Sequence, residues 1–499
     1  HAASGIGEAF LDGIPMMVIA GGVRRDTGRA YQLHDMDQHA LLKPITKGTW
    51  RVERHADVVP TIYEAFRVAM SGEPGPVFVE IPVELQLIPG EAGELPRFDG
   101  PGRAARTPAA AELDRAAALL RHAVRPGIFC GWGAVDTGEA LEHLAEALGA
   151  PVATTLQGLS AFRSNHPLHA GFALGPSAVP ASQNAFKSCD CLLAIGTRFA
   201  EIPTGSYGYE PPANLVHVDI NPQVFGANYP AAVAIEGDAR AVVMALAERL
   251  TEVQGAAARR QQVAAQIAAD KSAYLEEWLA HDPAGRVNPA RFFRALRARL
   301  PDDGIVVADD GNHTFLVAEL MPMHAPRCFF SPSDFNSMGY CVPGVIGAKL
   351  ARPERTVVGI VGDGAVRMTG LEMATAVAQG IGVAWFVFND GELAQIAQAQ
   401  QVPYNRKTCT VLPPLDLEGL ARANHVAFER MDNDAAVERI IERALSTAGS
   451  GRPVLVDVRI DYSKRTRFTE GTIRTNLKRF DMGTKARLVG RALWRKVTG

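Results

Sequence analysis

The sequence lacks the features that would place it in a membrane or on a nucleic acid. No apolar run reaches the roughly 18 residues of a membrane span. Its charge is nearly balanced, with 51 lysines and arginines against 54 aspartates and glutamates, so no excess of one sign attracts nucleic acid or an anionic lipid surface. These absences exclude a membrane span, argue against a nucleic-acid partner and favour a cytoplasmic protein.

Cysteine is scarce and follows no metal-binding pattern. The six cysteines are scattered, and none forms the Cys-x-x-Cys spacing of a zinc or redox site. Cys189 and Cys191 open the apolar segment CLLAI, so we interpret them as reduced thiols of a core rather than as ligands. The sequence also begins without methionine, which favours a fragment of a longer protein.

What the sequence has instead is an alternation of apolar strands with helical segments, which predicts an α/β fold. Its 499 residues leave room for three domains, each a doubly wound parallel sheet with binding sites at the carboxyl ends of the strands. We expect a first domain at 1–92, a linker at 93–110, a middle domain at 111–254, a linker helix at 255–285, a third domain at 286–462 and a basic tail at 463–499.

The most informative motif is the run Gly362-Asp363-Gly364. It follows an apolar strand predicted at 355–360 and precedes a helix predicted at 371–379. Glycines at a strand-to-helix turn let the backbone approach a phosphate closely, and the free N–H groups of a helix start point at it. The motif alone is also common in plain turns, so its interpretation needs a second element.

That second element follows along the chain. The apolar segment 383–388 predicts another strand and leads to Asn389 and Asp390, and Asp390 lies 27 positions after Asp363. Because parallel strands deliver their carboxyl ends to one edge of a sheet, Asp363 and Asp390 can converge on Mg²⁺, an ion that prefers oxygen ligands.

This pair of elements resembles the diphosphate and Mg²⁺ motif of thiamine-diphosphate enzymes. The resemblance implies diphosphate contacts from Gly362, Gly364 and Ala365. It also implies metal ligands from Asp363, Asp390 and the backbone carbonyl of Glu392. The family usually has Asn-Asn at the second site, so Asp390 makes the site more negative, and we expect metal binding to survive.

Further segments resemble one subgroup, the acetolactate (acetohydroxyacid) synthase-like enzymes. The turn at 310–313 is similar to their second diphosphate-binding turn, which implies cofactor contacts from Gly311, Asn312 and His313. The loop at 337–340 is similar to their loop around the thiazolium ring. By that match Met338 would bend the cofactor, and the carbonyl of Asn336 would accept its 4′-amino group. The similarity extends to about Tyr462 and includes the segments 5–22, 43–52 and 154–172 in the family's order.

The resemblance makes the three domains a partial pyrimidine-binding domain, a middle domain and a diphosphate-binding domain. The family's activating glutamate would lie upstream of His1, so no catalytic residue is assigned. We expect either a fragment of a longer protein or a short form that cannot activate the cofactor normally. Glu8 belongs to a different element, and we interpret it as a surface or capping group.

Whether the chain binds a second cofactor, FAD, stays open. Acetohydroxyacid synthases bind FAD in the middle domain, and the segments Gly196–Phe199 and His217–Asn221 resemble their adenine-nucleotide side. Against FAD, the flavin-contacting Gly-Met-His-Gly is not present, and the matching place reads Gly171-Phe172-Ala173-Leu174-Gly175.

The expected substrate pocket departs from the branched-chain synthases. Gln395 and Ala399 stand where those enzymes commonly carry Met and Trp, which implies a more open and polar pocket. Arg367 could bind a substrate carboxylate or be a solvated or interface arginine. The loop His34–Gln38 is somewhat more similar to oxalyl-CoA decarboxylase, and it could either manage acceptor protons or be a plain polar loop.

We therefore predict thiamine-diphosphate-dependent decarboxylation of a 2-oxo acid with carboligation, at a site shared by two subunits of a homodimer or homotetramer. Two alternatives stay open: a 2-hydroxyacyl-CoA lyase or oxalyl-CoA decarboxylase-like enzyme acting on an acyl-CoA with the same cofactor, and a catalytically silent binding homologue.

The tail carries eleven lysines and arginines against two acidic residues between 464 and 496, and apolar residues at 488–497 predict a helix with one apolar face. This helix could close over an anionic substrate, lie on an anionic membrane or dock on the body. Docking is the first expectation.

Overall fold

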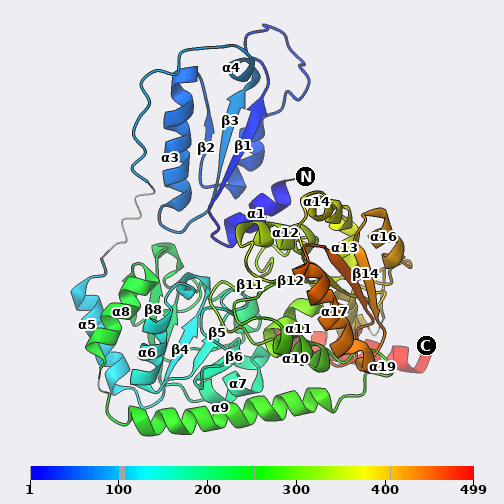
Figure 1. Cartoon of the computed structure of the whole chain (residues 1–499). Coiled ribbons are helices and arrows are strands. Elements are labelled where there is room, and N and C mark those ends of the chain that lie inside the picture. The colour runs from blue at the N-terminus through cyan, green and yellow to red at the C-terminus, as the bar shows by residue number, and fades with distance from the viewer. Residues whose placement is uncertain (1, 101–106, 252, 405, 499) are drawn as a thin grey trace. The chain divides into compact units, whose positions relative to one another are not determined.

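The computed structural model describes residues 2–100, 107–251, 253–404 and 406–498 (Figure 1). The chain forms two compact units, one made of His1–Arg106 with Pro332–Ser337 and the other of Thr107–Ser331 with Met338–Gly499. The three sheets of the described residues are built from parallel strand pairs, so the predicted α/β class with three parallel sheets is confirmed. Within the described ranges, no helix is both long enough and apolar enough to cross a membrane.

The first unit contains a three-stranded sheet in the order β1-β3-β2. Its strands are β1 (Met16–Gly22), β2 (Thr49–Arg51) and β3 (Pro76–Pro82). Its helices are α1 (Ala3–Leu11), α2 (Gln38–Leu42), α3 (Val58–Met70) and α4 (Val83–Leu87). The central strand β3 is almost fully buried because successive side chains enter two different apolar clusters, Val77 and Val79 one and Phe78 the other.

The second unit begins with a six-stranded sheet in the order β6-β5-β4-β7-β8-β9. Its strands are β4 (Pro126–Cys130), β5 (Val152–Thr154), β6 (His169–Phe172), β7 (Cys191–Ile195), β8 (Asn214–Asp219) and β9 (Val233–Glu236). Its helices are α5 (Ala110–His122), α6 (Glu139–Leu148), α7 (Pro180–Phe186) and α8 (Ala239–Arg249). The 24-residue helix α9 (Ala256–Leu279) follows it.

The same unit contains a second six-stranded sheet in the order β11-β10-β12-β13-β15-β14. Its strands are β10 (Ile305–Ala308), β11 (Phe329–Phe330), β12 (Val357–Gly362), β13 (Ala384–Phe388), β14 (Ala427–Met431) and β15 (Val454–Val458). Its helices are α10 (Pro289–Arg299), α11 (Asn312–Leu320), α12 (Cys341–Ala351), α13 (Asp363–Thr369), α14 (Met373–Ala378), α15 (Ala394–Tyr404), α16 (Leu417–Ala423) and α17 (Val437–Gly449).

One apolar cluster joins the two sheets of the second unit. It includes Phe172 of β6, Val179 directly before α7, Phe292 of α10 and Phe315 of α11. The middle and third domains expected from the sequence therefore share a core and fold as one compact unit.

The helix after the glycine motif begins earlier than predicted. We expected it at 371–379, but α13 begins at Asp363 itself and is followed by a 3₁₀ turn at Gly370–Glu372 and by α14. Gly364 is a weak helix former, so the sequence does not predict a helix that begins at Asp363. Burial of Ala365 and Val366 in the core beneath β12 favours a helix there despite that glycine.

The tail forms two helices, α18 (Arg467–Arg479) and α19 (Met482–Thr498). α18 packs on the middle part of the unit. α19, which contains the helix predicted at 488–497, lies against α15, as the expected docking requires. Of the apolar face predicted at 488–497, the side chains of Val489, Ala492, Leu493 and Val497 lie outside the described residues.

Candidate functional site

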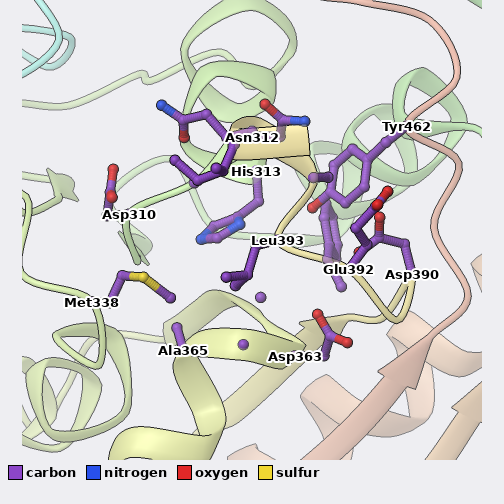
Figure 2. Close-up of a pocket in the computed structure, with 17 residues that line it drawn as sticks. Asp310, Asn312, His313, Met338, Asp363, Ala365, Asp390, Glu392, Leu393 and Tyr462 are labelled. Carbon is purple, nitrogen blue, oxygen red and sulfur yellow. The ribbon is translucent and has the colours of Figure 1, made fainter. Parts of the chain in front are cut away.

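The candidate site lies at the carboxyl edge of the second six-stranded sheet. The neighbouring strands β10, β12 and β13 end at Ala308, Gly362 and Phe388, and their following segments line one pocket (Figure 2). The pocket contains about 550 Å³ of empty space, part of which is open to solvent. The predicted residues that line it are Gly311, Asn312, His313, Met338, Gly362, Asp363, Gly364, Ala365, Asp390, Glu392 and Gln395.

Two carboxylates lie on one side of this pocket (Figure 2). Asp363 is 3% exposed, and its Oδ2 accepts a hydrogen bond from the backbone N–H of Gly391 at 3.1 Å. Burial raises the pKa of Asp363 to about 6. Burial, and then the charge of Asp363, raise the pKa of Asp390 to about 7. The negative charge of two such carboxylates is balanced by a cation bound between them or by a proton on one of them.

The rest of a coordination sphere would come from other groups. Among the described residues, no group of three or more His, Cys, Asp or Glu side chains could hold a metal ion. The side chain of Glu392 is engaged elsewhere, because Oε2 accepts from Lys407 at 2.6 Å and Oε1 from Thr410 at 3.1 Å. A metal held by this pair therefore needs oxygen from the backbone or from a ligand, as Mg²⁺ commonly takes from substrate phosphates.

Two buried polar atoms on the opposite side of the pocket have no hydrogen-bond partner, namely Nε2 of His313 and Oδ1 of Asn312. His313 is 4% exposed and Asn312 is 6% exposed, and Figure 2 shows the His313 ring pointing into the pocket. Burial lowers the pKa of His313 to about 3, so the imidazole is neutral. Because buried polar groups are nearly always satisfied, these atoms indicate a polar ligand.

The turn before α11 requires glycine. Gly311 has a φ of +149°, and a Cβ at this position would lie 2.6 Å from the His313 ring. A Cβ on Gly362 would lie 3.1 Å from the same ring. The two glycines therefore let His313 lie between the turns that follow β10 and β12.

Asp309, which directly precedes the predicted turn at 310–313, holds the loop bearing Met338 in place. It is fully buried and accepts backbone hydrogen bonds from Gly339 at 2.9 Å and Cys341 at 2.8 Å. Burial raises the pKa of Asp309 to about 6. An acidic residue directly after the apolar strand β10 was the signal that could have identified it.

Three of the predicted site residues do not line the pocket. Arg367 is exposed and donates to the carbonyl of Pro413 at 2.5 Å. Ala399 is exposed on α15, whereas Gln395 of the same helix lines the pocket. Asn336 belongs to the first unit and has a φ of 58°.

The pocket also has lining residues that sequence reasoning missed. Phe388, Leu393 and Ile396 supply apolar surface, and Tyr462 lies beyond the end of β15. Burial, followed by the charges of Asp390 and Asp363, raises the pKa of Tyr462 well above its usual range. Tyr462 is far from the motifs in the sequence, so their spacing could not identify it as a lining residue.

Glu8, in the first unit, is not the surface or capping group that we expected. It is 2% exposed, and its carboxylate accepts from the backbone N–H of Phe335 at 3.2 Å and of Ser337 at 3.1 Å. Gly7 permits this contact, because a Cβ there would lie 2.8 Å from the Phe335 ring. The interpretation was wrong because a segment more than three hundred residues away covers this face of α1.

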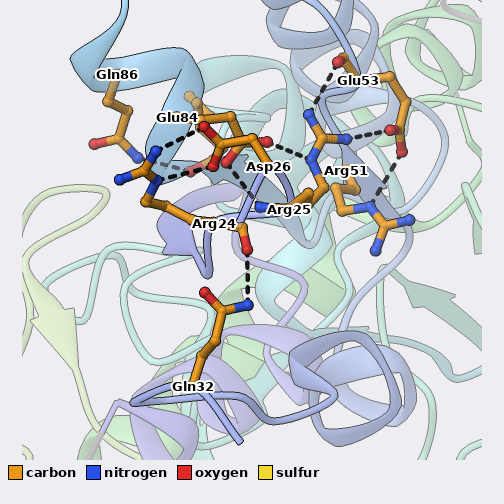
Figure 3. A network of polar contacts seen from close by, with 9 residues as sticks. Arg24, Arg25, Asp26, Gln32, Arg51, Glu53, Glu84 and Gln86 are labelled. Atoms are coloured by element: carbon orange, nitrogen blue, oxygen red, sulfur yellow. Dashed lines mark hydrogen bonds and ion pairs between the residues drawn. The ribbon is translucent and has the colours of Figure 1, made fainter. Parts of the chain in front are cut away.

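The loop after β1, which contains the predicted His34–Gln38 segment, is fixed at its base by arginines (Figure 3). Arg25 donates to Glu84 at 2.5 Å and also pairs with Glu53, while Arg24 pairs with Asp26 at 2.6 Å. Farther along, Asp37 accepts from Ala40 N–H at 2.9 Å and caps α2. At least one carboxylate of the segment therefore has a structural role.

Comparison with known proteins places the chain in a family. Residues 113–246 match the family described as thiamine pyrophosphate enzyme, central domain, and residues 309–458 match its C-terminal TPP binding domain. The acetolactate synthase large subunit of Corynebacterium glutamicum is 31% identical over 80% of this chain and 64% of its own length. A probable acetolactate synthase large subunit of Methanocaldococcus jannaschii is 30% identical over 92% of this chain and 79% of its own. The isozyme 2 large subunit of Escherichia coli acetolactate synthase is 30% identical over 92% and 81%. The chain thus spans less than two thirds of the first relative, and it belongs to the thiamine pyrophosphate enzymes, in their acetolactate synthase-like branch.

Proposed function

We propose that the chain is part of a thiamine-diphosphate- and Mg²⁺-dependent enzyme that decarboxylates a 2-oxo acid and joins the remaining fragment to a second carbonyl compound. The observation that carries this proposal is the pocket in which Asp363 and Asp390 face the unpartnered atoms of His313 and Asn312. A carboxylate pair suits a cation, and the backbone N–H groups at the starts of α11 and α13 suit the phosphates that the cation would bridge.

The residues present fit the cofactor in distinct roles. Asp363, Asp390 and the carbonyl of Glu392 would hold Mg²⁺, and the backbone N–H groups of Asn312 and His313 at the start of α11 would donate to a phosphate oxygen. Gly362, Gly364 and Ala365 would let the backbone approach the diphosphate. When bound, thiamine diphosphate supplies the nucleophilic carbon and the electron sink for loss of CO₂.

The protein would then position and shield this chemistry. Met338 enters the pocket from a loop that Asp309 holds to β10, so its side chain can press on the cofactor from a fixed base. Apolar Phe388, Leu393 and Ile396 would limit water near the reacting carbon. We also propose that the Asn336 carbonyl accepts the 4′-amino group, and that two copies of the chain, in a homodimer or homotetramer, complete the site.

Reaction with an acyl-CoA is the second candidate. It is favoured by the small, exposed side chain of Ala399 on α15, which leaves that part of the helix surface without a bulky side chain. Its thioester substrate would be larger than a 2-oxo acid, so the second candidate requires a wider pocket mouth than the first.

The test combines binding with product analysis. Calorimetric titration should give thiamine-diphosphate binding that requires Mg²⁺, and turnover of the complete protein with pyruvate should release CO₂ and form a hydroxy-oxo acid. Turnover only with oxalyl-CoA or a 2-hydroxyacyl-CoA would favour the second candidate. Cofactor binding without turnover of any of these would favour the catalytically silent homologue, and lack of cofactor binding would overturn the proposal.

A further inference from the structure

Helix α18 packs on the turn Gly175–Ser177 of the middle domain. By the resemblance stated above, the adjoining segment 171–175 stands at the flavin-contacting place of acetohydroxyacid synthases. Phe468 of α18 stacks on Phe315 of α11 with ring centroids 3.8 Å apart, and its ring lies 6.2 Å from that of Phe172. All three rings belong to the core that joins the two sheets of this unit. Phe468 therefore anchors one face of α18 in this apolar core.

The contact between α18 and the turn Gly175–Ser177 is as close as backbone permits. A Cβ on Gly471 would lie 2.2 Å from the carbonyl oxygen of Pro176, so only glycine fits. Ser177 Oγ donates to the carbonyl of Phe468 at 3.3 Å. No group as thick as an aromatic ring system fits between a helix and a turn at this separation.

The far end of α18 closes on a second turn. A Cβ on Gly208 would lie 2.5 Å from Thr475 Oγ1, and Asn476 donates to Ser206 Oγ at 3.5 Å. Arg479 donates to the carbonyl of Ser206. The helix thus covers the turns that follow both β6 and β7.

The start of α18 is anchored by a buried carboxylate. Glu319 of α11 accepts from the backbone N–H groups of Arg467 at 3.1 Å and Phe468 at 2.9 Å, and also from the hydroxyl of Tyr274. Glu277 of α9 pairs with Arg467 and with Lys464, each at 2.8 Å. Cations of the tail are used here to hold the helix in place.

The segment 171–175, which lies under α18, forms no open groove for a ligand. Ala173 and Leu174 are fully buried, and the carbonyl of Ala173 accepts from Ser182 at 2.6 Å. On the adenine side, a Cβ on Gly131 would lie 2.1 Å from the carbonyl of Gly196, so these glycines serve the packing of one loop on another. The residues therefore do not fit FAD.

We propose that α18 occupies the place of a flavin: the middle domain binds no FAD, and the chain's own helix α18 holds that domain to α11 instead. The proposal concerns residues outside the pocket of Asp363 and Asp390, so it stands independently of the cofactor and reaction proposed above.

The test uses the full chain with Mg²⁺ and thiamine diphosphate. Flavin absorbance and fluorescence after denaturation report any FAD that copurifies, and titration with free FAD reports uptake. Trypsin cleavage after Arg474 and Lys478, mapped by mass spectrometry, reports undocking of α18. The variant Gly471→Leu is compared with Gly490→Leu, a matched change in α19 at a position where a Cβ meets no atom within 4 Å.

We expect no FAD in the unmodified protein and protection of both cleavage sites in it and in Gly490→Leu. Overpacking against Pro176 should raise cleavage in Gly471→Leu by about five- to a hundredfold. Stoichiometric FAD in the unmodified protein would overturn the proposal without any variant. So would unchanged protection of α18 in a Gly471→Leu protein that still binds thiamine diphosphate.

Discussion

The Asp363 carboxylate accepts the backbone N–H of Gly391 at 3.1 Å and so links the two halves of the acidic motif. Asp363 begins α13 after strand β12, and Gly391 follows Asp390 after strand β13. The hydrogen bond fixes the turn that carries Asp390 relative to the helix start. The two carboxylates are therefore preorganised before any cation binds.

Removing the first carboxylate should abolish cofactor binding. Asp363→Ala takes away both a proposed metal ligand and the acceptor for Gly391, and loss of even an outer partner of a metal site costs about 10- to 100-fold, so a larger loss is expected here. Calorimetric titration of thiamine diphosphate with Mg²⁺ measures it. Asp432→Ala, an exposed aspartate on the same unit, is the control, and unchanged affinity in Asp363→Ala would refute the assignment.

The Asp390 carboxylate should make the stability of the cofactor-free protein depend on pH. The pKa of Asp390 is about 7, raised from an ordinary value of 3.8, so the folded protein holds this proton more tightly than the unfolded chain does. The associated stability is present below the unfolded pKa and is lost as pH rises through 7. The melting temperature should fall over that window.

Asp390→Asn removes this titration, so its cofactor-free form should melt higher than the unmodified protein at pH 8, and Mg²⁺ should bind it less tightly. Scanning calorimetry at pH 6 and pH 8, with and without Mg²⁺ and thiamine diphosphate, checks both points. A pH profile that is identical in the two proteins would assign the sensitivity to other groups, of which Asp309 and Asp363 also have a raised pKa.

The pocket-lining residue of α15 should influence product choice more than its exposed neighbour. Gln395→Met replaces a polar lining side chain and should shift the ratio of products from competing acceptors by an amount equivalent to about 1–3 kcal/mol. Ala399→Trp adds a larger side chain outside the described lining and serves as the comparison. Product ratios from pyruvate with paired acceptor acids decide the matter, and a larger effect of Ala399→Trp would place position 399 in the working pocket.

The Glu8 carboxylate should stabilise the first unit by accepting hydrogen bonds. Glu8→Ala leaves the part-buried N–H groups of Phe335 and Ser337 without their carboxylate, at a cost of about 1 kcal/mol for each hydrogen bond lost. Hydrogen exchange at these two amides should accelerate, less so in Glu8→Gln, which keeps one acceptor oxygen. Glu64→Ala, an exposed change on α3, should leave both amides protected.

The last helix should act on substrate access. Removing 480–499 should leave α18 docked but takes away α19, which lies against α15 and carries five lysines and arginines and no acidic residue. Thiamine-diphosphate affinity should stay within a few fold, while KM for an anionic substrate should rise, most clearly at about 0.01 M salt, where charges act over about 30 Å. A KM that ignores both truncation and salt would leave α19 a structural role only.

The sequence by itself determined the three parallel sheets and the core of the pocket. Each signal was local: an apolar strand that ends in a short polar turn, as in Asp310–His313, Gly362–Gly364 and Asn389-Asp390. Because parallel strands end at a common edge, strand order alone brings such turns together, and the pocket lining includes residues from all three.

Only the tertiary structure decided which side chains are covered. Glu8 and Ser337, Asp309 and Gly339, and Gly471 and Pro176 are each far apart along the chain, and burial of one member depends on where the other folds. Arg367 and Ala399 are exposed for the same reason: their exposure depends on the packing around their helices and not on the motif spacing that suggested them. Periodicity and spacing report local backbone geometry, whereas burial is a property of contacts between distant segments.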